Sequence, residues 1–177
     1  MASVNLANLK ELYFRTGDTE NLINHYPMAM AWIFGFNDPD SMVKVAIDKK
    51  RKIIYIQECL YKSGNSAEQL RLSVGTHVKT SDLIVADAAD ARMISELSRY
   101  YNIKAVNKAK WTVAEALKMM QDYELVITED SHNLSKELSN YIWNDKKAGV
   151  PIDDFNHLID AARYYFMNSQ IAEFFVI

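Results

Sequence analysis

The sequence is poor in the residues that mark disulfide-rich, fibrous or low-complexity chains. Cys59 is the only cysteine among 177 residues, which excludes a disulfide framework and a cysteine-built zinc site and leads us to expect a reducing, cytoplasmic location. Five glycines and three prolines are too few for a flexible linker or a low-complexity tract. No apolar run reaches the roughly 18 residues of a membrane-spanning helix, so we expect no membrane association.

The motifs of several common enzyme classes are absent as well. The chain contains no G-x-x-x-x-G-K-[ST], no G-x-G-x-x-G, no G-x-S-x-G and no paired metal-binding histidine motif. These absences set aside P-loop ATPases and the other classes that the motifs define. Cys59 lies in an apolar segment, and we interpret it as a core residue rather than a nucleophile.

The chain has little excess charge. It has 20 basic and 23 acidic residues, a formal net charge of −3, and 49% of its residues are hydrophobic. These values fit one globular domain, or at most two small ones. A mildly acidic chain is not an obvious nucleic-acid binder, so any contact with DNA has to come from local basic patches.

Hydrophobic patterning predicts an α/β fold with a mixed sheet and flanking helices. Three strands come first, at 28–34, 41–48 and 53–60, and form an antiparallel meander. Helices and short strands then alternate: helices at 66–78, 90–101, 112–123, 133–143 and 155–166, and strands at 83–86, 103–106 and 125–128. Residues 1–27 are uncertain, with a possible helix at 8–14 and a turn at 16–18, and we treat them as an extension to a domain at 28–177.

Two of the predicted helices carry recognisable start signals. Thr112 is followed three residues later by Glu115, the spacing of a capping box. Asp153 or Asp154 could cap the last helix, which we expect to begin at Phe155.

Three residues are candidates for chemistry. Asp87 follows the apolar strand 83–86, at the edge where open α/β sheets bind ligands, although from position alone a helix-cap or turn aspartate is the simpler interpretation. His157 and Asp160 are three residues apart on one face of the last helix, opposite its apolar residues. Two interpretations are open: the two side chains face a polar cleft, or they form an ordinary i,i+3 pair on a solvated helix face.

Basic residues gather in two places and are weak candidates for phosphate contacts. Lys49, Lys50, Arg51 and Lys52 form one cluster, for which a solvated hairpin tip is the simpler interpretation. Lys104, Lys108 and Lys110 form the other.

Four segments, taken in order, carry a family resemblance over about residues 28–166. They are FGFNDP at 34–39, IVADAAD at 84–90, NLSKELSNY at 133–141 and PIDDFNHLIDAARY at 151–164. The last is the most specific. Together they resemble the C-terminal nuclease domain of tailed-phage terminase large subunits, which has a ribonuclease H-like fold.

The resemblance implies a DNA endonuclease that cuts concatemeric viral genomes with two Mg²⁺ or Mn²⁺ ions. Asp87 and Asp160 would be metal ligands, and His157 would lie near the metals or the scissile phosphate. Nearby Lys and Arg side chains would hold the DNA backbone. The implied partners are double-stranded DNA, a terminase ATPase domain, the small terminase subunit and the portal. The implied location is cytoplasmic: the host cytoplasm during phage assembly, or the cytoplasm of a cell whose prophage encodes the protein.

One position departs from the family pattern. The family places an aspartate where this chain has Ile33, and isoleucine cannot bind a metal. Asp38 and Asp40 lie in the turn beyond that strand and would substitute only if the backbone brought them back. Three interpretations remain: an impaired terminase nuclease, a catalytically inactive DNA- or protein-binding module, or another ribonuclease H-like nuclease such as a junction resolvase.

Overall fold

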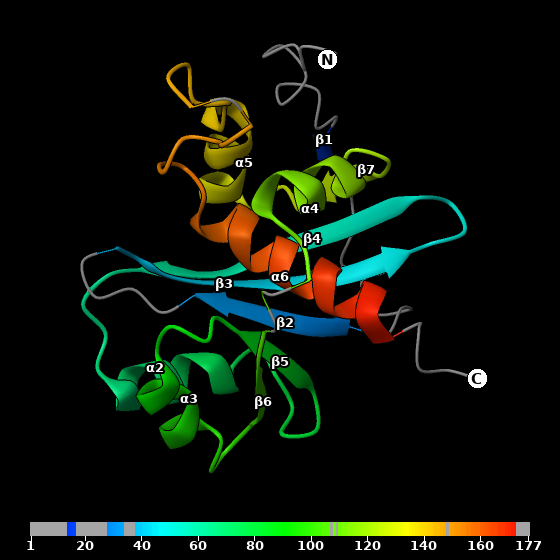
Figure 1. The fold of residues 1–177 in the computed structure, drawn as a ribbon. Helices are drawn as coiled ribbons and strands as arrows, with labels where there is room; N and C mark the ends of the chain where they lie inside the picture. The colour runs from blue at the N-terminus through cyan, green and yellow to red at the C-terminus, as the bar shows by residue number, and fades with distance from the viewer. Residues whose placement is uncertain are drawn as a thin grey trace.

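The computed structural model describes residues 14–16, 28–33, 38–106, 108, 110–147 and 149–172. Within them a seven-stranded mixed sheet has the order β1-β7-β4-β3-β2-β5-β6 (Figure 1). Its strands are β1 (Phe14–Thr16), β2 (Met28–Ile33), β3 (Asp40–Asp48), β4 (Ile53–Lys62), β5 (Leu83–Ala86), β6 (Asn102–Ala105) and β7 (Glu124–Ile127). The central strands β2, β3 and β4 form the predicted antiparallel meander, and the remaining pairings are parallel.

Helices cover both faces of this sheet (Figure 1). They are α2 (Ala67–Gly75), α3 (Ala91–Leu97), α4 (Val113–Met120), α5 (His132–Asn140) and α6 (His157–Ala172). One core cluster joins Trp32 and Ile84 of the sheet to Leu70 of α2 and to α3. A larger one joins Val43 and neighbouring strand residues to α4, α5 and α6. The prediction of an α/β domain with flanking helices is therefore confirmed.

Strand alternation decides which face carries a site at the end of β5. Ile84 and Ala86 belong to the cluster under α2 and α3, whereas Val85 packs with Tyr164 and Met167 of α6. Successive strand residues point to opposite faces. Asp87, the next residue after β5, therefore shares the α6 face with Val85.

The helix boundaries correct several sequence expectations. The capping box of Thr112 and Glu115 is present at α4. The last helix begins at His157 instead of Phe155, because Phe155 has φ 55°, which lies outside the helical region. The helix expected at 133–143 ends at Asn140, since Trp143 forms a β-bridge with Pro151.

The N-terminal part of the chain contributes a strand. Phe14, the last residue of the possible helix at 8–14, belongs to β1, and the rest of that segment lies outside the described residues. Residues 17 and 18 of the expected turn lie outside them as well. Strand β1 pairs in parallel with β7 at one edge of the sheet. Among the described helices, none has the length and hydropathy to cross a membrane.

Candidate active site

Asp87 lies at the carboxyl end of β5, beside the end of β2. Its N–H donates to the Trp32 carbonyl at 3.0 Å, which continues the β2–β5 pairing by one residue. The next position along β2 is Ile33, whose backbone pairs with Ser41 of β3. The strand-end location predicted for Asp87 is thus observed. Asp87 is not the cap of α3, because that role belongs to Asp90, whose Oδ1 accepts the Met93 N–H at 2.9 Å.

Both carboxylate oxygens of Asp87 have donors. The Lys108 Nζ lies 2.6 Å from Oδ1, and the Ala89 N–H donates to the same oxygen at 2.9 Å. The Tyr164 hydroxyl donates to Oδ2 at 3.1 Å. Burial alone would raise the pKa of Asp87, but these donors outweigh it and hold the pKa below its ordinary value. Asp87 is consequently an ionised, half-buried carboxylate.

Asp160 lies one turn into α6 and pairs with Arg163. The Arg163 guanidinium donates to Oδ1 from Nη2 at 2.9 Å and from Nε at 3.1 Å. Burial raises the pKa of Asp160 despite the attraction of this cation. The Arg163 side chain is only 4% exposed, so the pair is an inner feature of the site rather than a solvated surface pair.

Lys108 and Tyr164 connect Asp87 with Asp160. Burial is the main cause that raises the pKa of the Tyr164 phenol. The negative charges of Asp160 and, to a smaller extent, Asp87 raise it further. Lys108 stabilises the ionised form of Asp160 as well as pairing with Asp87, and its Nζ lies 5.0 Å from the centre of the Tyr164 ring. Asp87 therefore contacts both Lys108 and Tyr164, and Asp160 lies one helical turn before Tyr164 on α6.

His157 lies at the outer edge of this arrangement. Its side chain is 22% exposed, and Nε2 is 4.0 Å from Asp38 Oδ1. Asp38 thus lies near the first residue of α6. Asp40 does not take part, because it is buried and its Oδ2 accepts the Asn65 amide at 2.8 Å.

Glu137 of α5 is a site neighbour that the sequence reasoning missed. It is 2% exposed, and its Oε2 accepts the N–H groups of Leu158 and Ile159 at 2.8 and 3.1 Å. This carboxylate, rather than Asp153 or Asp154, caps α6. Its Oε1 is buried without a hydrogen-bond partner in the described part of the chain. Burial, with a smaller contribution from Asp160, raises the pKa of Glu137 to about 7.

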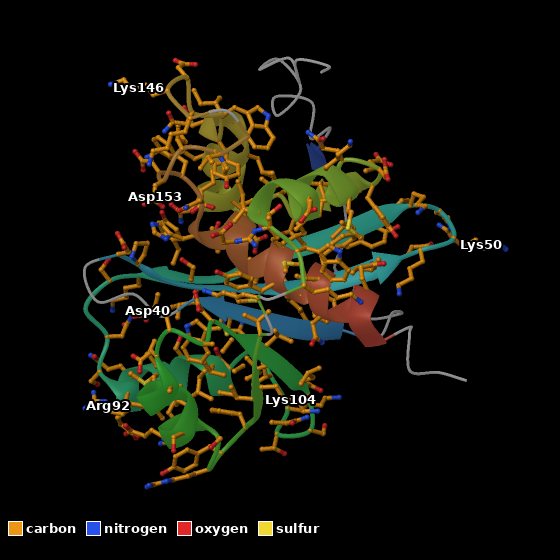
Figure 2. The ribbon with its side chains drawn as sticks, viewed as in Figure 1. Asp40, Lys50, Arg92, Lys104, Lys146 and Asp153 are labelled. Atoms are coloured by element: carbon orange, nitrogen blue, oxygen red, sulfur yellow. The ribbon has the colours of Figure 1, made fainter. Side chains whose placement is uncertain are left out.

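The two basic clusters lie at different ends of the sheet. Lys108 belongs to the site, and Lys110 of the same loop stacks on Trp111 with Nζ 4.7 Å from the ring centre. Strand β3 runs seven residues, or about 23 Å, from Ser41 to Asp48, and residues 49–52 form the β3–β4 hairpin tip beyond it. Figure 2 shows Lys50 and Asp40 at opposite ends of the sheet.

The hairpin-tip cluster has partners of its own, away from Asp87. Lys49 donates to the Ser169 carbonyl at 3.4 Å, near the end of α6. Arg51 pairs with Asp48 at 3.2 Å, and the Lys52 ammonium lies 4.6 Å from the Tyr123 ring centre. The structure does not bring this cluster to the predicted site.

A cavity of about 580 Å³ opens beside Asp160. It lies between the first turn of α4 and the segment that joins α5 to α6, and Tyr141, Asn144 and Lys147 contribute polar groups to its wall. Asp153 and Lys146 of that segment are labelled in Figure 2. Asp160 is therefore reachable from solvent on this side.

The donor set suits a hard divalent cation in kind but not in number. Carboxylate oxygens are the ligands that Mg²⁺ and Mn²⁺ prefer. Within the described residues, however, no three His, Cys, Asp or Glu side chains are grouped closely enough to hold a metal ion. The position beside Asp87 is Ile33, which supplies no ligand. A metal at this site would rest on Asp87 and Asp160.

Cys59 matches its expected role in the core. It packs against the cluster around Trp32. Burial raises the pKa of its thiol to about 12, which leaves the reactive thiolate scarce at neutral pH.

The sheet order, the meander and the acidic residues at the end of β5 and on α6 define a ribonuclease H-like α/β domain. The chain belongs to the terminase RNase H-like domain family, whose model matches residues 34–168. The predicted resemblance is therefore confirmed at the level of family and fold. No curated protein matches the chain in sequence.

Solved structures of phage terminases share this fold. The nuclease domain of the large terminase g2p from bacteriophage SPP1, a structure with bound Mn, superposes with a TM-score of 0.78 at 24% identity, covering 88% of this chain and 95% of that one. The P22 large terminase nuclease domain gives 0.71 at 15% identity, with 90% and 89% covered. The large terminase of a thermophilic bacteriophage gives 0.70 at 13%, and 43% of that longer chain is matched by 90% of this one.

Proposed function

We propose that this chain is the metal-dependent DNA endonuclease domain of a viral packaging terminase, which cuts concatemeric genome DNA with an activity weakened by Ile33. The observation that supports the proposal is that Tyr164, one helical turn after Asp160 on α6, donates to Asp87 at the carboxyl end of β5, where Lys108 pairs with the same carboxylate. By family, its partners are double-stranded DNA, a terminase ATPase domain, the small subunit and the portal.

Asp87 and Asp160 would hold Mg²⁺ or Mn²⁺, which when bound acts as a Lewis acid toward phosphate oxygens and lowers the pKa of bound water. Two ions are expected from the family. The chain's own residues prepare these ligands. Arg163 fixes the orientation of the Asp160 carboxylate through two donors to one oxygen. Tyr164 orients Asp87, and Glu137 anchors the first turn of α6, which carries His157 and Asp160.

His157 supplies a donor at the solvent side of the site. Its partial exposure and its position at the first residue of α6 allow it to meet a phosphate from the DNA backbone. Lys110 of the neighbouring loop offers a sequence-independent phosphate contact.

Cleavage of DNA tests the proposal. The chain is incubated with supercoiled plasmid and Mn²⁺, beside Asp160→Asn, which keeps the size of the side chain and its acceptor oxygen. We expect slow nicking by the parent chain and a loss of at least about tenfold in the variant, since a ligand charge is removed. Equal cleavage by the two proteins would assign the activity to another site or to a contaminant.

A second function is favoured by one observation, the isoleucine at position 33. With two carboxylates in place of a larger acidic cluster, the domain would hold DNA or a protein partner without cutting. This alternative predicts DNA binding in the absence of metal and no cleavage at any Mn²⁺ concentration.

A further inference from the structure

We propose that the Lys108 ammonium competes with a divalent metal ion for the Asp87 carboxylate. Metal then binds Asp87 only when the lysine side chain moves away from it. The inference rests on the proposed function, because it takes Asp87 as a metal ligand.

The contacts of Asp87 place the lysine where a cation would bind. Lys108 Nζ is 2.6 Å from Oδ1, the short distance of a charge-assisted hydrogen bond. The Ala89 N–H donates to the same oxygen, and Tyr164 donates to Oδ2. A metal ion that binds Oδ1 must therefore replace one of its two donors, and the cation is the donor that it repels.

The surroundings of Lys108 hold its ammonium in place when no metal is present. Its Nζ lies 5.0 Å from the Tyr164 ring centre, within range of a cation–π interaction. Asp160, one helical turn before Tyr164 on α6, also attracts it. The ammonium thus takes a cation's place on Asp87 and is attracted by Asp160 as well.

Lys108 can leave, whereas the other cation of the site cannot. The Lys108 side chain is 47% exposed and flexible, so a rotation of the side chain alone releases it to water. Arg163 is 4% exposed and holds Asp160 through two donors. The exchangeable positive charge of the site is therefore the lysine.

Charge balance makes the competition consequential. Lys108 and Arg163 balance the two carboxylates, and Ile33 adds no negative charge beside Asp87. A divalent ion meets a stronger attraction once Lys108 has moved away. The lysine therefore lowers metal affinity in this chain.

Metal titration of matched variants tests the inference without measuring catalysis. Free Mn²⁺ is followed by electron paramagnetic resonance in the parent chain, Lys108→Met and Lys110→Met. The two variants lose the same charge from the same loop, but Lys110 stacks on Trp111. We expect about tenfold tighter binding for Lys108→Met, a change within about twofold for Lys110→Met, and loss of the gain when Asp87→Asn is added.

Three results would overturn the inference: unchanged affinity in Lys108→Met, equal gains in both lysine variants, or no Mn²⁺ binding by any protein. Reductive methylation of the parent chain gives a second measurement that needs no variant. Saturating Mg²⁺ should increase labelling of Lys108 relative to Lys110, and unchanged labelling would contradict the displacement. If the proposed function fails instead, Lys108→Met gains affinity for Mn²⁺ but no protein cuts DNA.

Discussion

At the scale of single residues, the carboxylates of the candidate site form ion pairs within the protein instead of being solvated by water. Asp87 and Asp160 each pair with a cation from this chain, and the shared Tyr164 couples them. The strand-end position of Asp87 and the shared helix of His157 and Asp160 could be predicted from the sequence, whereas their roles in a metal site stay a prediction. Glu137 could not be predicted, because an acidic residue on a short amphipathic helix has no sequence signal that separates a buried cap from a solvated side chain.

Glu137 should make the stability of the fold depend on pH. Its native pKa of about 7 exceeds the ordinary 4.5, so the native state retains a proton that the unfolded chain releases. This group therefore supports the fold fully below pH 4.5, and its contribution is lost as the pH rises through about 7, an effect of about 3 kcal/mol.

Urea unfolding of the parent chain and Glu137→Gln at pH 5 and pH 8 measures this effect. Glutamine keeps a carbonyl oxygen for the Leu158 and Ile159 N–H groups but does not titrate. We expect the parent to lose stability relative to Glu137→Gln between the two pH values. Glu137→Ala, which has no acceptor, should be destabilised at both. A constant difference between parent and Gln variant would show that Glu137 ionises as in water.

At the scale of elements, local signals were reliable where they act within one segment. The capping box at α4 is an example, since the side chains of Thr112 and Glu115 each accept a hydrogen bond from the other residue's backbone N–H. The start of α6 was mispredicted because its cap comes from α5, 21 residues earlier. The end of α5 was mispredicted because the Trp143–Pro151 bridge draws the chain away. Both errors come from contacts between different segments, and the hydrophobic periodicity of one segment gives no information on such contacts.

Gly75, the last residue of α2, is required by such a contact. A Cβ at this position would lie 2.9 Å from the Tyr101 hydroxyl, which donates to the Arg71 carbonyl at 2.6 Å. Alanine is the better helix former. We nevertheless expect Gly75→Ala to lower the free energy of unfolding by about 1–2 kcal/mol, because the crowded hydroxyl must move.

Thermal or urea unfolding of a double-mutant cycle with Tyr101→Phe checks this expectation. Without the hydroxyl, Gly75→Ala should become neutral or stabilising. If Gly75→Ala stabilised the protein in both backgrounds, helix propensity would outweigh the contact, and the packing of α2 on Tyr101 would be looser than described.

At the scale of the whole molecule, the fold class and the order of elements could be predicted, but the neighbours in the sheet could not. The meander follows from consecutive strands with short turns. The placement of β5 beside β2, and of β7 beyond β4, depends on crossovers through helices. The placement of β5 brings Asp87 next to position 33, on the sheet face that α6 covers, and the β3–β4 pairing puts the basic hairpin tip at the far end.

The central claim is that position 33 and Asp87 stand at one metal-binding edge with Asp160, and Ile33→Asp tests it most directly. Plasmid cleavage in Mn²⁺ is compared for the parent chain, Ile33→Asp and Ile33→Asn, which has a similar size to the aspartate variant but no charge. We predict that Ile33→Asp alone raises metal-dependent cleavage by at least about tenfold, because a third carboxylate joins the ligands. No gain with Ile33→Asp, or an equal gain with Ile33→Asn, would contradict the account.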